Sequence, residues 1–179
     1  LVPDLYVAWH AGKSSWKNYK SLNKYSIGIE INNPGHQFNY KRFSKKQIGS
    51  LLKLIKVLKK KYKIKKKNIL GHSDIAPNRK KDPGEKFPWK ELAKLKLAHW
   101  HKLDEKKLKQ YRLKKIDSSD ENKFFINLHK IGYTRFRSKS SAIKKRLIVK
   151  AFQRRFRQRL VNGICDKECL ILSKNLLKS

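Results

Sequence analysis

A histidine and an aspartate, His72 and Asp82, lie ten residues apart in a proline-containing stretch with the composition of a loop. Imidazole nitrogen and carboxylate oxygen are both common zinc ligands, and a catalytic zinc ion needs three protein ligands plus an open position for water. Lys80 adds a cation that would stabilise the oxyanion formed when water attacks a carbonyl. The spacing predicts a hydrolytic zinc site, although a lone histidine and aspartate on a loop are more often surface or turn residues.

Three motifs surround these residues. They are A-W-H-A-G at residues 8–12, S-I-G-I-E-I at residues 26–31 and G-H-S-D-I-A-P-N-R-K-K-D-P-G at residues 71–84. In this order they resemble the zinc-dependent N-acetylmuramoyl-L-alanine amidases of the amidase-2 type, the AmpD-like bacterial cell-wall enzymes. The resemblance covers roughly residues 1–100. It implies hydrolysis of the amide bond between N-acetylmuramic acid and L-alanine in peptidoglycan or muropeptides.

The resemblance also implies roles for the metal and catalytic residues. His72 and Asp82 would be two of three zinc ligands, and Lys80 would lie near the tetrahedral intermediate. Glu30 would act as general base, because the attacking water must lose a proton and the leaving amine must gain one. Without this context, a lone glutamate in a strand is usually solvated or paired with a lysine. Arg79, next to Lys80, is expected to be solvated.

The remaining candidates are substrate-binding residues. The resemblance places Trp9 and His10 in a segment that lines the substrate cleft, whereas a packed tryptophan with a hydrogen-bonded histidine is an equally good interpretation. Asn32 would contact substrate, although an Asn pair before Pro34 and Gly35 more often makes a turn.

One family feature is absent from this sequence. The third zinc ligand of such amidases is a histidine upstream of the A-W-H-A-G motif, and this chain begins only eight residues before Trp9. The sequence also contains no methionine, which predicts a fragment, a processed product or an unusual start codon. We expect an amidase domain without its first strand or strands, weak zinc binding and little activity unless an upstream fragment supplies the missing ligand.

Hydrophobic periodicity predicts the elements that position these residues. Strands are expected at residues 5–9 and 25–31, where apolar residues alternate with polar or small ones. A capping box at residues 44–47 begins an amphipathic helix that runs to Tyr62. A short strand at residues 68–71 would deliver His72. The fold class is therefore α/β, a mixed central sheet flanked by helices, in residues 1–103.

A basic linker at residues 104–119 is expected to lead into a small three-helix domain at residues 120–179. The predicted helices are 121–131, 141–156 and 166–177. The core is expected to contain Phe125, Leu128, Ile131, Ile143, Leu147, Ala151, Phe152, Leu170 and Leu177. The A-F-Q motif at residues 151–153 and the G-I-C-D motif at residues 163–166 resemble a peptidoglycan-binding domain. A plain helical bundle, or a nucleic-acid-binding unit that uses the arginines at residues 154–159, is the alternative.

The composition of the chain limits the classes of partner that it is expected to bind. The chain has 47 Lys and Arg residues against 13 Asp and Glu residues, a formal net charge of +34. Charge alone favours an anionic partner, but the excess is mostly lysine and typical of AT-rich coding, so we expect no specific nucleic acid. Peptidoglycan peptides are themselves rich in carboxylates.

Cellular location and the cysteines are less constrained by the sequence. We expect no transmembrane segment and no signal peptide, and the resemblance implies the periplasm or cell envelope. A non-catalytic peptidoglycan-binding remnant stays open as an alternative to an enzyme. Cys165 and Cys169 are expected to be small buried hydrophobes.

Overall fold

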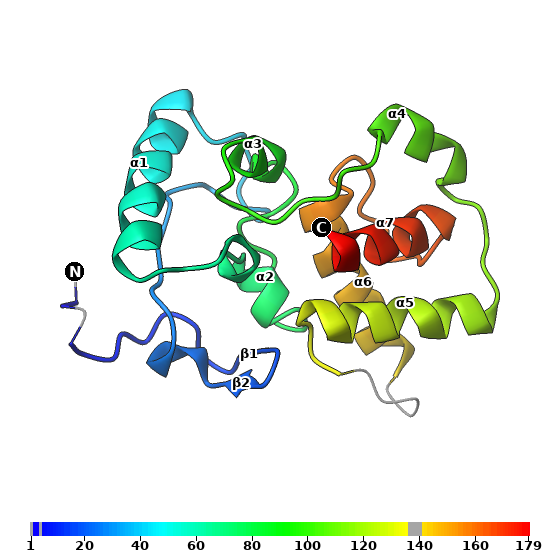
Figure 1. The fold of residues 1–179 in the computed structure, drawn as a ribbon, viewed down its shortest axis with the longest axis horizontal. Coiled ribbons are helices and arrows are strands. Elements are labelled where there is room, and N and C mark those ends of the chain that lie inside the picture. Colours follow the sequence, from blue (N-terminus) through cyan, green and yellow to red (C-terminus); the bar gives the residue numbers. More distant parts are fainter. Residues whose placement is uncertain (1, 4, 136–140) are drawn as a thin grey trace.

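The computed structural model describes residues 2–3, 5–135 and 141–179. Its helices and strands, in chain order, are β1 (Ser15–Trp16), β2 (Tyr19–Lys20), η1 (Leu22–Lys24), α1 (Lys45–Lys61), η2 (Lys66–Asn68), α2 (His72–Ile75), α3 (Trp89–Lys94), α4 (Glu105–Leu108), η3 (Lys109–Tyr111), α5 (Ser118–Ile131), α6 (Ala142–Phe156) and α7 (Lys167–Lys178). Figure 1 shows α1 and α3 in one half of the molecule, α4 to α7 in the other, and α2 between them. None of the helices in the described ranges has the length and apolar character needed to cross a membrane.

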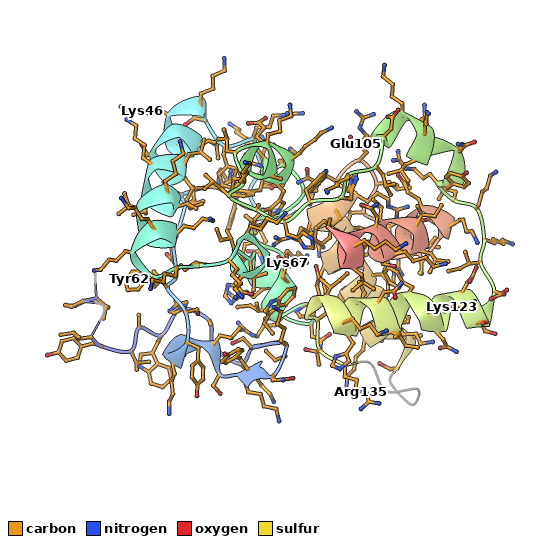
Figure 2. The ribbon with its side chains drawn as sticks, viewed as in Figure 1. Lys46, Tyr62, Lys67, Glu105, Lys123 and Arg135 are labelled. Atoms are coloured by element: carbon orange, nitrogen blue, oxygen red, sulfur yellow. The ribbon has the colours of Figure 1, made fainter. Side chains whose placement is uncertain are left out.

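Helix α1 follows its sequence signals closely. The Ser44 hydroxyl accepts a hydrogen bond from the Gln47 amide, and the Gln47 side chain accepts one from the Ser44 amide, which completes the predicted capping box. Ile48, Leu51 and Ile55 are buried in a cluster with residues 87–98. The lysines of α1 cover its outer side, where Lys46 extends into solvent near one end (Figure 2).

The two strands predicted near the N-terminus are not formed. Within the described residues the only sheet is the two-residue antiparallel ladder of β1 and β2. The amide of His10 donates to the Ala8 carbonyl, so this segment turns instead of extending. The His10 ring also lies against residue 28, where an added Cβ would come within 2.5 Å of the ring. Among the described residues no backbone hydrogen bond joins residues 5–9 to residues 25–31.

The β1–β2 hairpin packs against the end of α5. The Trp16 ring contacts the Tyr133 ring edge-on at 5.1 Å between centroids, and the Lys17 amide donates to the Gly132 carbonyl at 2.7 Å. Gly132 has φ = 140°, and an added Cβ would lie 2.5 Å from the Trp16 ring. This close approach requires glycine at residue 132.

The three C-terminal helices are confirmed, with corrections to their predicted core. Helix α5 packs along α7, and α6 contributes buried residues to the same cluster. Ile143, predicted to be buried, is 72% exposed, while Ile148 and Val149 are buried instead. Leu147 on α6 is only partly buried. On α7, Leu177 is exposed, whereas its neighbour Leu176 is buried.

The segment predicted to be a basic linker is folded onto the C-terminal helices. It contains α4 and η3, and Leu108 is buried in the same cluster as α5, α6 and α7. The Arg112 guanidinium donates two hydrogen bonds to the Glu168 carboxylate, at 2.7 and 2.8 Å. Ala11, Trp16 and Leu22 from the N-terminal part belong to that cluster as well. One hydrophobic core therefore extends across the predicted domain boundary.

Candidate metal and catalytic site

The structure brings His72 and Asp82 together. His72 is the first residue of α2, and the predicted strand at residues 68–71 is instead η2 followed by irregular backbone. The Ser73 amide donates to the Asp82 carbonyl at 2.9 Å, which holds the two ends of the loop side by side. As a result, His72 Nδ1 lies 3.1 Å from Asp82 Oδ2.

The surroundings of Asp82 favour the ionised form of its carboxylate. Burial raises the pKa of Asp82, but the hydrogen bond from His72 and the nearby Lys80 ammonium lower it, and the pKa lies below its ordinary value. Lys80 is partly buried and contributes through its charge. An anionic oxygen beside an imidazole nitrogen is a suitable donor set for zinc.

The spacing of the two atoms also suits zinc. Tetrahedral ligands that each lie about 2.0–2.1 Å from zinc are about 3.3 Å apart, close to the 3.1 Å observed between His72 Nδ1 and Asp82 Oδ2. The Ala11 carbonyl lies 3.2 Å from His72 Nε2, so it can accept a hydrogen bond from a protonated Nε2, which leaves Nδ1 free to bind a metal. In the described part of the chain no third His, Cys, Asp or Glu joins the pair in a metal-binding group.

Arg79 is exposed, as expected, and it also connects this loop to the A-W-H-A-G segment. Its Nη2 donates to the Ala11 carbonyl at 2.6 Å and to the Lys13 carbonyl at 3.2 Å, and it lies 3.5 Å from His72 Nε2. An added Cβ at Gly12, where φ is 57°, would lie 3.0 Å from Nη2. Sequence reasoning missed this contact, and the glycine inside the motif was the available signal.

The predicted substrate-binding residues differ in their surroundings. Trp9 is 89% exposed, so the alternative of a packed tryptophan is wrong. Both ring nitrogens of His10 have partners, the Ala8 carbonyl and the Ser26 hydroxyl, each at 2.9 Å. Asn32 is exposed, and its carbonyl accepts a hydrogen bond from Gln47 at 2.7 Å.

Glu30 lies on the surface beside α1. It lines a shallow groove together with Asn32, Gln47 and Leu54. Within the described ranges its carboxylate has no hydrogen bond or ion pair, and no contact joins it to His72 or Asp82. Its role as general base remains a prediction.

The C-terminal motifs form an internal hydrogen-bond network. The buried Gln153 side chain donates to the Asn162 side chain and the Ile164 carbonyl, and accepts from the Gly163 amide. Asp166 caps α7 by accepting from the Cys169 amide. These hydrogen bonds give the A-F-Q and G-I-C-D motifs a structural role within the C-terminal helices.

The predicted arginine contact face and the cysteines can also be placed. Arg154, Arg155 and Arg157 are buried, so the nucleic-acid contact face considered as an alternative is wrong for these three arginines. Cys169 is buried and Cys165 is partly buried, and both thiols are free. Burial raises the pKa of Cys169 to about 12, as expected of an unreactive packed thiol.

Comparison with known proteins identifies the family of the chain. Residues 1–85 match the family model described as N-acetylmuramoyl-L-alanine amidase, Amidase_2. Over 183 aligned residues the chain is 35% identical to N-acetylmuramoyl-L-alanine amidase AmiD of Escherichia coli (strain K12), with 99% of this chain and 66% of AmiD covered. The chain thus spans slightly less than two thirds of this relative.

Solved structures extend the similarity to the whole fold. The structure matches that of E. coli AmiD in complex with anhydro-N-acetylmuramic acid-L-Ala-D-gamma-Glu-L-Lys at a TM-score of 0.88 and 35% identity, over 99% of this chain and 71% of the other. AmpDh3 from Pseudomonas aeruginosa matches at a TM-score of 0.85 and 32% identity, with the same coverage. The predicted amidase fold class is confirmed, and the chain belongs to the Amidase_2 family of N-acetylmuramoyl-L-alanine amidases.

Proposed function

We propose that this protein hydrolyses the amide bond between N-acetylmuramic acid and L-alanine in peptidoglycan or muropeptides. The observation that carries this proposal is the pair of His72 Nδ1 and Asp82 Oδ2, 3.1 Å apart, in a chain of the Amidase_2 family. The AmiD neighbour was solved with an anhydromuramyl peptide, which supports a muropeptide as the substrate class.

His72 and Asp82 would hold a zinc ion. When bound, zinc supplies Lewis acidity toward the scissile carbonyl and the attacking water. Glu30 takes the proton from that water and delivers it to the leaving amine. Lys80 stabilises the negative charge that develops on the carbonyl oxygen. These assignments follow the family resemblance.

Substrate contacts are assigned to the A-W-H-A-G segment and its neighbour. The exposed Trp9 ring offers an apolar surface to the sugar or peptide, next to His10. Asn32 would donate from its side-chain amide to a substrate carbonyl.

Two ligands hold zinc less firmly than three. We therefore expect slow turnover and weak zinc binding from these 179 residues, and a polypeptide outside them as the source of the third ligand. The C-terminal helices would add affinity for peptidoglycan and raise the local concentration of substrate. The chain would consist of a catalytic part at residues 1–103, a connecting segment at 104–119 that packs on the C-terminal helices, and a three-helix part at 120–179. It would be located in the periplasm or cell envelope.

Peptide release from purified muropeptides, followed by mass spectrometry with and without added zinc, tests the function. We expect release that requires both zinc and Glu30, with Glu30→Ala inactive and Glu91→Ala, which changes an exposed glutamate on α3, unaffected. Release that survives both zinc removal and Glu30→Ala would overturn the assignment.

A non-catalytic peptidoglycan-binding protein is the second candidate, and the two-ligand metal site favours it. Sedimentation with insoluble peptidoglycan separates the two candidates. Binding without any release of peptide, at saturating zinc, would support the second candidate.

A further inference from the structure

A buried ionic network ties α2 to the C-terminal helices. Asp74, two residues after His72, is 1% exposed, while Arg155 on α6 and Tyr133 after α5 are 2% and 1% exposed. Arg155 Nη1 donates to Asp74 Oδ2 at 2.6 Å, and the Tyr133 hydroxyl donates to Asp74 Oδ1 at 2.6 Å. Both carboxylate oxygens are therefore held from the C-terminal part of the chain, which lies directly beside α2 in Figure 1.

The same network fixes the backbone that precedes His72. The Gly71 amide donates to Asp74 Oδ2 at 2.8 Å, and Arg155 Nη2 donates to the Ile69 carbonyl at 2.8 Å. The Arg155 guanidinium also lies over the Trp89 ring, 4.2 Å from its centroid. His72 is thus bracketed on both sides by groups that depend on Arg155.

Helix α2 cannot hold this position alone. It has four residues, and so short a helix has no stability in water without tertiary contacts. Removing one partner of a buried ion pair leaves a buried charge without compensation, which is strongly destabilising. Burial and the Asp74 carboxylate raise the pKa of Tyr133 well above its ordinary value, so its hydroxyl stays a donor.

We propose that Asp74, Tyr133 and Arg155 are positioning residues that hold His72 in register with Asp82. The C-terminal helices are then a structural part of the metal site, in addition to any role in binding the wall. Arg155 belongs to the segment whose motif resembles a wall-binding domain, and the network gives it a different task. The metal part of this inference rests on the proposed function, whereas the positioning of His72 does not.

Amide hydrogen exchange in the metal-free protein tests the positioning directly. Tyr133→Phe removes one hydrogen bond to Asp74 and keeps the ring that contacts Trp16. We expect exchange in residues 71–82 to accelerate roughly tenfold, the effect of losing one hydrogen bond to a charged group, while exchange in α1 stays unchanged. Arg155→Met should accelerate it further, and Arg155→Lys should restore part of the protection.

Arg112→Met is the matched control, because Arg112 forms a comparable ion pair with Glu168 on α7 and has no hydrogen bond to α2 among the described residues. It should accelerate exchange around η3 and α7 but not in residues 71–82. The inference is overturned if exchange in residues 71–82 is unchanged in Tyr133→Phe and Arg155→Met, or if Arg112→Met accelerates it equally.

Cobalt binding, followed by visible absorption, provides the second readout. We expect Tyr133→Phe to weaken Co²⁺ binding several-fold and Arg112→Met to leave it unchanged. If no variant, including the wild-type chain, binds Co²⁺, the proposed zinc chemistry fails while the exchange data still decide the positioning role.

Discussion

His72 and Asp82 face each other at hydrogen-bond distance before any metal is bound. A ligand pair that is already oriented loses little side-chain entropy on binding, so the affinity depends chiefly on the chemistry of the two donor atoms. The carboxylate charge of Asp82 is then the property to test.

Asp82→Asn should weaken zinc binding at least tenfold while the protein stays folded, because the amide keeps the shape of the side chain and loses its negative charge. Isothermal titration calorimetry with zinc measures the affinity, and circular dichroism checks the fold. Lys81→Gln, which changes an exposed neighbour, is the control. Equal affinity of Asp82→Asn and the wild-type protein would remove Asp82 from the ligand set.

Gly132→Ala should lower the free energy of unfolding by about 2 kcal/mol or more, because the new Cβ meets the Trp16 ring at a residue that also has positive φ. Denaturant titration measures the change. Gly49→Ala in α1 is the control, since nothing lies within 4 Å of its added Cβ; it should stabilise by about 0.5–1 kcal/mol. A Gly132→Ala protein of wild-type stability would mean that the hairpin does not dock as described.

At the scale of elements, local signals predicted the helices well and the strands poorly. The capping box and 3.6-residue periodicity of α1 lie within one segment, as do the patterns of α5, α6 and α7. A strand instead depends on a distant partner, and the His10 amide bonds to the Ala8 carbonyl of its own segment while its ring bonds to Ser26. Alternation alone could not reveal that.

The candidate site was likewise predicted where its residues lie close together in the sequence and missed where their partners are distant. The short H-x9-D spacing and the motifs identified His72 and Asp82, which lie on one loop. The contacts of Arg79 and Asp74 were not predicted because their partners, Ala11 and Arg155, are 68 and 81 residues away along the chain. Supporting residues of this kind cannot be read from local spacing.

Two histidines between α3 and α4, His99 and His101, should make the protein less stable in acid. Burial, more than the neighbouring cations, lowers the pKa of His99 to about 4, and burial lowers that of His101 to about 4. Unfolded histidines titrate near pH 6.5, so between pH 6.5 and 4 the unfolded state binds more protons and stability falls as the pH falls.

Each histidine should contribute a loss on the order of 2–3 kcal/mol over that range. Thermal unfolding at a series of pH values measures it. The slope should decrease in His99→Gln, which removes one titrating group, but not in His129→Gln, which changes an exposed histidine on α5. A pH-independent melting temperature between pH 4 and 6.5 would contradict this assignment.

At the scale of the whole molecule, the hydrophobic core that joins Ala11, Trp16 and Leu22 to α5, α6 and α7 couples the two halves. We expect one cooperative unfolding transition, because neither half can open without exposing that core. Scanning calorimetry should give equal calorimetric and van't Hoff enthalpies. Two separated transitions, with the C-terminal helices melting apart from α1, would show that the halves are independent.

The exposure of Trp9 has an optical consequence. Trp16 and Trp89 are 5% and 3% exposed and Trp100 is partly buried, whereas Trp9 is 89% exposed. A collisional quencher such as acrylamide should therefore reach Trp9 first, and the quenchable, red-shifted part of the fluorescence should come mainly from that indole. The chain carries its own fluorescent reporter on the segment that adjoins His72, and occupation of that surface by a muropeptide can be followed by protection from quenching.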